Sequence, residues 1–190
     1  MEITTWYLEQ DDPAGIRPAR PPAWPVEIVR AELPSPELNR FLYTAVGGDW
    51  SWSDRLGWTW RQWHDWLDRP GVETWVASVR GTPAGYAELD GHRPGEVEIA
   101  YFGLLPRFAG QGVGGHLLTV VLRHAWSLSE RHPALPPVRR VTLNTCSLDG
   151  PAALANYQAR GLRVVRTQTR PGDSQPQAPG PWPGADRPKP

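Results

Sequence analysis

A glycine-rich turn is the feature that most restricts how this chain can fold. Residues 110–115 read Gly-Gln-Gly-Val-Gly-Gly, with a strand-like stretch before them and, from Val113, a helix-like stretch after them. Glycine lets the backbone take positive φ and approach a ligand closely, and the first amide groups of a helix have no partner within it. Four glycines in six residues exceed what a simple connection requires. The turn therefore predicts a cradle of N–H donors for a phosphate, at the positive end of a helix dipole.

The same glycines also satisfy a second pattern. Gly110, Gly112 and Gly115 match G-x-G-x-x-G, the fingerprint of dinucleotide-binding proteins. In those proteins the strand leads directly into the first glycine, and an acidic residue follows about 20 positions later. Here residues 106–109 intervene, and the next predicted strand ends in Thr145-Cys146. No lysine follows the glycines, which excludes a P-loop, so dinucleotide binding remains as the less favoured alternative.

Hydrophobic periodicity and turn residues predict an α/β arrangement with a mixed sheet, antiparallel strands first and then strand-helix-strand-helix-strand. The predicted strands are Ile3–Leu8 at an edge, Val26–Ala31, the hairpin pair Val72–Val79 and Pro83–Leu89, Glu96–Leu105, Val138–Thr145 and Leu162–Thr167. The predicted helices are Ser35–Val46, Thr59–Leu67, Val113–Leu128 and Gly150–Arg160. We expect one domain over residues 1–166. Residues 167–190 are rich in proline and glycine, bury too little to offset ordering, and are expected to form a disordered tail.

Composition narrows the classes of partner. Lys+Arg and Asp+Glu both number 20, so no net charge favours a nucleic acid or an anionic membrane. No apolar run approaches the length of a membrane span, and the first residues lack a basic segment followed by an apolar one, so we expect a soluble cytoplasmic protein. Cys146 is the only cysteine, which excludes an internal disulfide, and the spacing of the five histidines predicts no metal site.

Two segments resemble a known family. Glu98–Pro106, the glycine turn and Leu117-Leu118 are similar to motif A of the GNAT superfamily of N-acetyltransferases, and Asn156–Leu162 is similar to its second motif. The resemblance covers roughly Val72–Val165, so it carries no information about the first third of the chain. It implies a GNAT-like fold, with β-α-β-α-β built around a central splayed sheet.

The sequence departs from the family pattern at two positions. Ala109 stands where the family usually has Arg or Gln at the head of the phosphate loop, so backbone amides must hold more of the pyrophosphate, with Arg107 nearby. Leu162 replaces a phenylalanine of the second motif, which is a change in packing.

The resemblance implies transfer of an acetyl group from acetyl-coenzyme A to a primary amine of a small-molecule or peptide acceptor. The amine would attack directly in a ternary complex, with acetyl-coenzyme A as cosubstrate and without a metal. A catalytically inactive module that binds acyl-coenzyme A is the alternative. The implied coenzyme A contacts are Phe102, Gly103, Leu104, Ala109, Gly110, Gln111, Gly112, Val113, Gly114, Gly115, Asn144 and Asn156.

Two residues match catalytic positions of the family. Glu98 matches a strand glutamate that some members use as general base. The alternative is that Glu98 and Glu96 are both solvent-facing residues of one strand face. Tyr157 matches the tyrosine that protonates or hydrogen-bonds the coenzyme A sulfur, although a tyrosine on an amphipathic helix is usually a packing residue.

In this family the early helices and their loop commonly contact the acceptor. Trp50 and Trp52 lie in such a loop, where large aromatics are less expected, and are predicted to wall the acceptor pocket. Three charged residues are candidates for binding an ammonium or a carboxylate group of the acceptor: Asp49, Asp54 and Arg55. Three further tryptophans recur at helical spacing and predict a core face: Trp60, Trp63 and Trp66. Dimers are common among proteins of this kind, so a homodimer is also an expectation.

Overall fold

The computed structural model describes residues 2–50 and 52–172. Its strands are β1 (Glu2–Gln10), β2 (Glu27–Ala31), β3 (Val72–Val79), β4 (Thr82–Asp90), β5 (Glu96–Leu104), β6 (Arg140–Cys146) and β7 (Arg163–Pro171). Its α-helices are α1 (Pro36–Gly47), α2 (Trp60–Leu67), α3 (Val113–Trp126), α4 (Leu128–Arg131) and α5 (Ala153–Ala159). Two 3-10 turns are η1 (Pro13–Gly15) and η2 (Pro106–Phe108). The order of the strands and of the four predicted helices is confirmed, with small differences at the ends, whereas α4 and the two 3-10 turns were not predicted.

Local signals explain where the first helices begin. Ser35 accepts a hydrogen bond from the Leu38 amide at 3.3 Å, and Pro36 occupies the first turn of α1. Thr59 and Gln62 form a capping box at the start of α2. Both starts agree with the sequence prediction, because a cap depends on residues that are close together in the chain.

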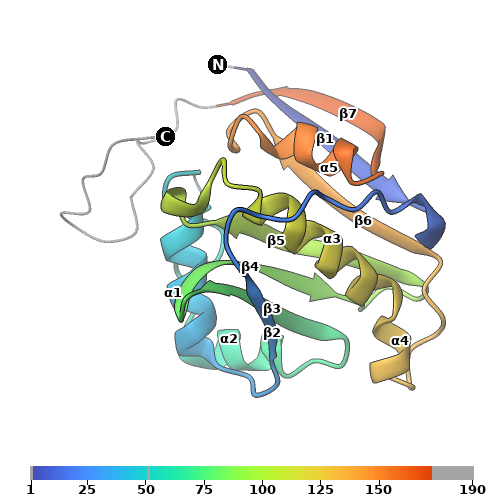
Figure 1. Ribbon diagram of the computed structural model, residues 1–190. Coiled ribbons are helices and arrows are strands. Elements are labelled where there is room, and N and C mark those ends of the chain that lie inside the picture. Colours follow the sequence, from blue (N-terminus) through green and yellow to red (C-terminus); the bar gives the residue numbers. More distant parts are fainter. Residues whose placement is uncertain (1, 51, 173–190) are drawn as a thin grey trace.

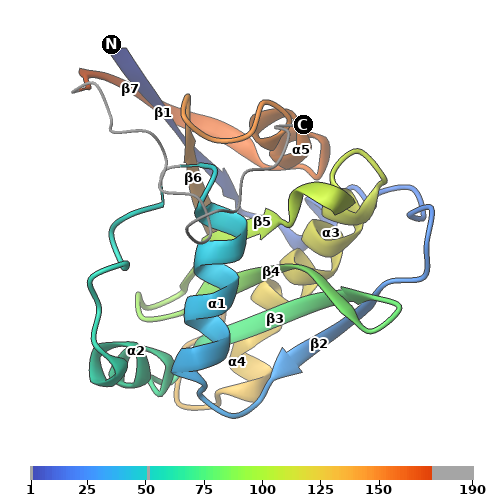
Figure 2. The same cartoon turned by 90° about the vertical axis from the view of Figure 1, so that its left-hand side faces the viewer.

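The strands form one mixed sheet in the order β2-β3-β4-β5-β6-β1-β7. β5 and β6 run parallel, and the other recorded pairs are antiparallel. α1 and α2 cover one face of this sheet, and α3 and α4 lie on the other (Figures 1 and 2). The predicted α/β class with a mixed sheet is therefore confirmed.

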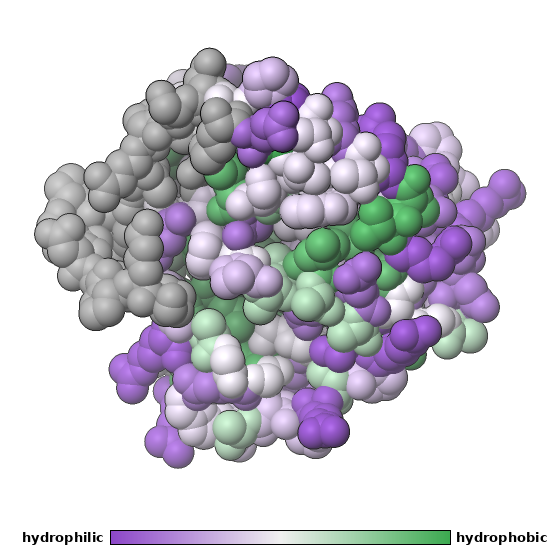
Figure 3. Space-filling model, turned by 90° about the horizontal axis from the view of Figure 1, so that it is seen from above, coloured by the Kyte–Doolittle hydropathy of each residue, from purple (hydrophilic) through white to green (hydrophobic). Residues whose placement is uncertain are grey.

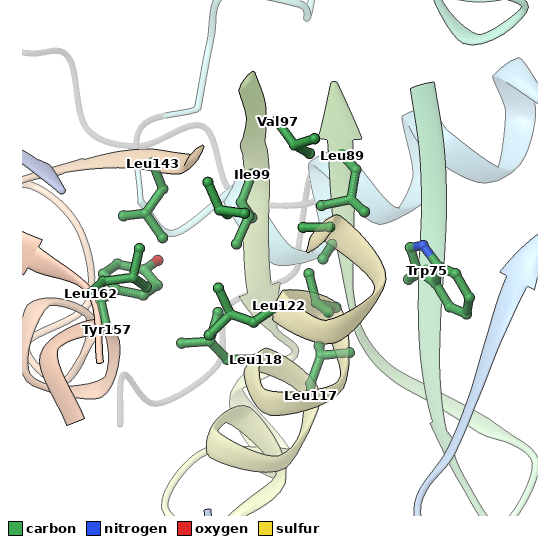
Figure 4. Close-up of a cluster of buried hydrophobic side chains, with 14 of the residues drawn as sticks. Trp75, Leu89, Val97, Ile99, Leu117, Leu118, Leu122, Leu143, Tyr157 and Leu162 are labelled. Atoms are coloured by element: carbon green, nitrogen blue, oxygen red, sulfur yellow. The ribbon is translucent and has the colours of Figure 1, made fainter. Parts of the chain in front are cut away.

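The main hydrophobic core lies between the sheet and α3. Leu117, Leu118 and Leu122 of α3 are fully buried and pack with Val97 and Ile99 of β5 (Figure 4). Burial of each such side chain stabilises the fold by about 1.5–3 kcal/mol. This packing fixes the first turn of α3, and with it the glycine turn, beside the end of β5.

β1 was expected at an edge of the sheet, and that expectation is wrong. The strand pairs with β6 on one side and with β7 on the other. Trp6, for example, is opposite both Thr145 and Thr167. A short apolar stretch predicts a strand but carries no information on its partners, which here lie more than a hundred residues away.

The boundary of the expected tail is also corrected. β7 continues to Pro171, so residues 167–171 are paired with β1 and are part of the sheet. All side chains of β7 are exposed, and hydrogen bonds to β1 rather than burial hold the strand in place. Residues 173–190, the rest of the expected tail, lie outside the described residues.

β7 forms one edge of the sheet and has exposed apolar side chains. Val164 and Val165 are 36% and 51% exposed. β7 lies at the top of Figure 1, and the view from above shows hydrophobic residues (green) reaching the surface among polar ones (Figure 3).

In the part of the chain that the structure describes, no helix has the length and apolar character needed to cross a membrane.

Candidate active site

The central strands separate at one end of the sheet. β5 and β6 are paired from Glu96 with Arg140 to Glu98 with Thr142, and no further. Beyond Glu98, β5 stays paired with β4 and β6 stays paired with β1. A cavity of about 840 Å³ opens where the strands part, and it is lined by β5, β6, α5, the glycine turn and the loop between α1 and α2. The edge of β5 that faces this gap can pair with an extended, peptide-like ligand.

A bulge in β5 lies at the point of separation. Glu88 of β4 pairs with Tyr101, whereas the next residue, Leu89, pairs with Ile99, so Ala100 has no partner on β4. A bulge bends its strand and increases the local twist. It therefore helps to turn the end of β5 away from β6.

The glycine turn has the backbone conformation that the sequence predicted. Gly110 has φ of 74° and Gly112 has φ of 80°, in the left-handed region that favours glycine. Gly112 caps α3, and the amide of His116 makes the first helical bond to its carbonyl at 3.1 Å. The amides of residues 113–115 precede that bond and need an acceptor from outside the helix.

Five of the seven residues predicted for the phosphate loop line the cavity: Ala109, Gly110, Gly112, Gly114 and Gly115.

Gln111 and Val113 do not line the cavity. Gln111 donates a hydrogen bond from Nε2 to the carbonyl of Arg107 at 2.7 Å, and Val113 is fully buried against Phe108. Both side chains are used by the protein itself, so the predicted contacts of these two residues with coenzyme A stay predictions that can involve only their backbone.

Glu98 and Glu96 lie in different environments. Glu98 is half-buried at the cavity, where burial first, and then the charges of Asp90 and Glu96, raise its pKa. Burial also acts on Glu96, but hydrogen bonds from Arg93 and Arg140 outweigh it and lower the pKa of Glu96. A carboxyl group with a raised pKa is suited to accept a proton from an ammonium group. The two glutamates therefore do not form the shared solvent-facing pair of the alternative interpretation.

Asp90 and His92 complete this end of the cavity. Asp90 accepts hydrogen bonds from Arg69 Nη2 at 3.0 Å and from the His92 amide at 3.1 Å, and its Oδ2 lies 2.8 Å from His92 Nδ1. Sequence reasoning missed both residues. The signal that could have found Asp90 is the register of the hairpin, because Asp90 is directly opposite Glu98.

Tyr157 belongs both to the core and to the cavity. Its side chain is 6% exposed, packs edge-on against Phe102 with ring centroids 5.8 Å apart, and lies beside Leu143 and Leu162 (Figure 4). Burial, with a smaller contribution from Asp149, raises the pKa of Tyr157. The phenol therefore stays protonated at neutral pH and can donate to an anion in the cavity.

The other predicted contacts of the pantetheine arm border the cavity as well. These are Phe102, Gly103, Leu104, Asn144 and Asn156. Asn156 Oδ1 accepts a hydrogen bond from Arg160 Nη1 at 3.3 Å. Cys146 is half-buried at the same wall, and burial raises the pKa of its thiol, which makes it a poor nucleophile.

The loop between α1 and α2 forms another part of the cavity wall. Trp50 and Trp52 both line the cavity, as predicted, whereas Asp49 does not. The Trp52 ring packs on Tyr43 and Tyr101 with centroids 5.6 and 4.9 Å away.

Two further expectations for this region are corrected. Arg55 lines the cavity, but its side chain is only 4% exposed and its guanidinium binds Glu88, so it is not available to read a ligand. Trp60 is 57% exposed, stacks on His64 and is not part of the core face on which Trp63 lies. The exposed position follows from where α2 meets the sheet, which helical spacing does not specify.

Within residues 2–50 and 52–172 there is no group of three or more His, Cys, Asp and Glu side chains that could hold a metal ion.

The comparisons with known proteins agree with this geometry. Residues 34–162 match the model of the acetyltransferase (GNAT) family, which is more than half of the chain. No curated protein matches the sequence. Among solved structures, a GCN5-related N-acetyltransferase from Kribbella flavida has a TM-score of 0.61 at 17% identity, over 87% of this chain and 56% of that one.

Two other solved structures are similar in fold. An aminoglycoside acetyltransferase from an uncultured soil metagenomic sample, solved with sisomicin, has a TM-score of 0.55 at 13% identity, over 71% of this chain and 86% of that one. A tandem GNAT protein from the clavulanic acid biosynthesis pathway has a TM-score of 0.54 at 17% identity, over 90% and 55% of the two chains. The chain spans only 49–63% of the length of the first four structures that it matches. The family match over residues 34–162, on a mixed sheet that opens beside a glycine turn, shows that the chain belongs to the GNAT family of acetyltransferases.

Proposed function

We propose that this protein transfers an acetyl group from acetyl-coenzyme A to the primary amine of a small-molecule acceptor, by direct attack in a ternary complex. The observation that carries the proposal is the gap between β5 and β6. The glycine turn, Glu98 and Tyr157 all line the one cavity that opens there.

The residues at the gap fit the donor. The free amides at the start of α3 suit a pyrophosphate, and they hold it through the backbone because Ala109 offers no side-chain donor. The edge of β5 from Phe102 to Leu104 suits the amide groups of the pantetheine arm. Asn156 supports the arm from α5.

Glu98 and Tyr157 supply the two proton transfers. An alkylammonium group has a pKa of about 10.4 and must lose a proton before its nitrogen can attack. Glu98 accepts that proton, directly or through water. The nitrogen then forms a bond to the thioester carbonyl carbon, the carbon–sulfur bond breaks, and Tyr157 donates its proton to the departing sulfur. The second proton that the nitrogen loses on becoming an amide returns to the Tyr157 phenolate through solvent.

Isothermal titration with acetyl-coenzyme A, and separately with NAD, tests the donor. We expect binding of acetyl-coenzyme A alone; tight binding of NAD alone would overturn the proposal. Thiol release over a panel of small amines then tests turnover. Binding of acetyl-coenzyme A without thiol release from any amine would instead indicate an inactive acyl-coenzyme A module.

A further inference from the structure

The loop between α1 and α2 lies at the end of the cavity where the acceptor would bind, and contacts of its side chains hold it there. Trp50, Trp52, Asp54 and Arg55 all line the cavity. Most of this stretch lies outside helix and strand, so regular backbone hydrogen bonds do not define its path. Turn hydrogen bonds, such as Trp52 N to the Gly47 carbonyl and Trp58 N to the Arg55 carbonyl, shape it locally. Contacts of its side chains then tie it to α1, α2 and the sheet.

Arg55 makes the most buried of these contacts. Its Nη1 donates to both carboxylate oxygens of Glu88 on β4, at 2.9 and 3.1 Å. The two side chains are only 4% and 1% exposed. Glu88 Oε1 also accepts a hydrogen bond from Trp66 Nε1 of α2 at 2.8 Å. One carboxylate therefore joins the loop, α2 and the sheet.

Aromatic rings surround the guanidinium of Arg55. Its Cζ lies 4.1 Å from the ring centroid of Trp66, 4.4 Å from that of Tyr101 and 4.6 Å from that of Trp58. Arginine prefers the faces of such rings, and it presents a planar fork that lysine cannot reproduce. The rings of Trp58, Trp66 and Tyr101 therefore form a cage that favours a guanidinium over an ammonium group.

The neighbouring residue is anchored to the same wall. Asp54 accepts hydrogen bonds from the hydroxyl groups of Tyr43 at 2.7 Å and Tyr101 at 2.5 Å. The Arg55 amide donates to the Tyr43 hydroxyl oxygen at 3.2 Å. Tyr43 and Tyr101 are the same rings on which Trp52 packs. The positions of Arg55, Asp54 and Trp52 are therefore linked.

A buried ion pair adds little net stability compared with a well-packed apolar pair, but breaking one partner is costly, and such pairs can fix a unique geometry. We propose that Arg55 and Glu88 are a positioning pair that holds the loop, and with it Trp52 and Asp54, in place as the acceptor-facing wall. The effect on acceptor affinity rests on the proposed function, whereas the effect on the loop does not.

The chain offers a matched control for Glu88. Glu73 of β3 is also buried, also pairs with arginine, and also accepts a hydrogen bond from an indole, Trp75 Nε1 at 2.9 Å. Its cationic partners are Arg131, Arg30 and His132. Glu73 bonds to α4, on the face of the sheet opposite α2, and does not line the cavity. Glu73→Gln therefore removes a similar charge at a site remote from the acceptor.

Hydrogen–deuterium exchange of the wild type, Glu88→Gln and Glu73→Gln measures the loop directly. We expect the amides of the α1–α2 loop to exchange about tenfold faster or more in Glu88→Gln, and to stay at wild-type rates in Glu73→Gln. Unchanged loop exchange in Glu88→Gln would overturn the proposal, as would equal acceleration by Glu73→Gln.

Chemical rescue gives a second, independent readout. Arg55→Ala removes the guanidinium, and guanidinium chloride, kept below the concentration that unfolds the wild type, should refill the cage and slow loop exchange. Sodium chloride at the same concentration should not. If Arg55→Ala does not fold, Arg55→Lys is measured in the same way, with faster loop exchange expected. Rescue by both salts alike, or wild-type exchange in Arg55→Lys, would contradict a positioning role.

Kinetic measurements then distinguish an effect on the acceptor side of the site from an effect on the donor side. In Glu88→Gln the KM for the amine should rise about tenfold or more, while the dissociation constant of acetyl-coenzyme A changes less than about threefold. Equal losses for both substrates would indicate a general defect and overturn the proposal. If no amine is acetylated by the wild type, the proposed function fails, and exchange and rescue still decide the role of the pair.

Discussion

Asp90 and Glu98 are directly opposite each other on β4 and β5, at the point where β5 leaves β6. Asp90 is bound by Arg69 and His92, whereas the pKa of Glu98 is raised by burial and by the charge of Asp90. Asp90 is thus held by two hydrogen-bonding partners, whereas Glu98 has a raised pKa that suits it to exchange a proton. This difference leads to the first two predictions.

Glu98→Gln should lower kcat/KM for the amine by about 100-fold to 10,000-fold, the range for loss of a general base. Because the wild-type base must be ionised to act, activity should rise with pH through the raised pKa of Glu98. The variant should lose that step and keep only the dependence that comes from the amine. Rates measured from about pH 5 to pH 9 with one amine check both expectations. A wild-type profile in the variant would remove Glu98 from the mechanism.

The same substitution should stabilise the protein at neutral pH. A raised pKa means that the folded chain binds the proton of Glu98 more tightly than the unfolded chain does. The ionised carboxylate therefore destabilises the folded state above that pKa, and this cost is absent below the ordinary value of 4.5. Denaturant unfolding should show a higher free energy of unfolding for Glu98→Gln at about pH 8, with the difference closing near about pH 4. A difference that grows at low pH would contradict the assignment.

Tyr157→Phe should lower kcat by about 100-fold or more and leave the dissociation constant of acetyl-coenzyme A nearly unchanged. Phenylalanine keeps the ring that packs against Phe102 and loses only the hydroxyl group. The melting temperature should therefore stay close to that of the wild type. Loss of stability with unchanged kcat would show that Tyr157 acts only in packing.

The parts of the structure that could be predicted from the sequence are those set by neighbours in the chain. The left-handed glycines, the cap at Ser35 and the hairpin turn at Arg80-Gly81, where both residues have positive φ, depend on a few adjacent positions. The site residues that came from the family resemblance, Glu98 and Tyr157, lie within the two motifs and do line one cavity.

The remainder depends on contacts between distant segments. Arg55 and Glu88 are 33 residues apart, and nothing near either residue indicates that they pair. The internal place of β1 requires β6 and β7, which follow at the far end of the chain. β7 has no buried face, so hydrophobic patterning could not show that it continues to Pro171.

Gly112→Ala should weaken binding of acetyl-coenzyme A. Its φ of 80° strains any residue with a Cβ, by about 1–2 kcal/mol, and the new Cβ would lie 3.2 Å from the Cα of Pro22. Relief of that strain would shift the turn and the amides that follow it. Titration calorimetry should show at least about tenfold weaker binding. Gly57→Ala is the control, because Gly57 has open space around it and no left-handed φ. If both variants bound acetyl-coenzyme A with equal affinity, the glycine turn would not be part of the donor site.

Trp52→Ala should raise the KM for the amine, because the Trp52 ring lines the cavity where the acceptor would enter. Gly47→Ala should do the same without touching Trp52, since a Cβ on Gly47 would clash with the Trp52 ring and displace it. An effect of about fivefold to 100-fold in KM is expected for a lost aromatic contact. Trp60→Ala removes a tryptophan that is 57% exposed and does not line the cavity, so it should leave KM unchanged. If Trp52→Ala also left KM at the wild-type value, the acceptor would have to bind against another wall of the cavity.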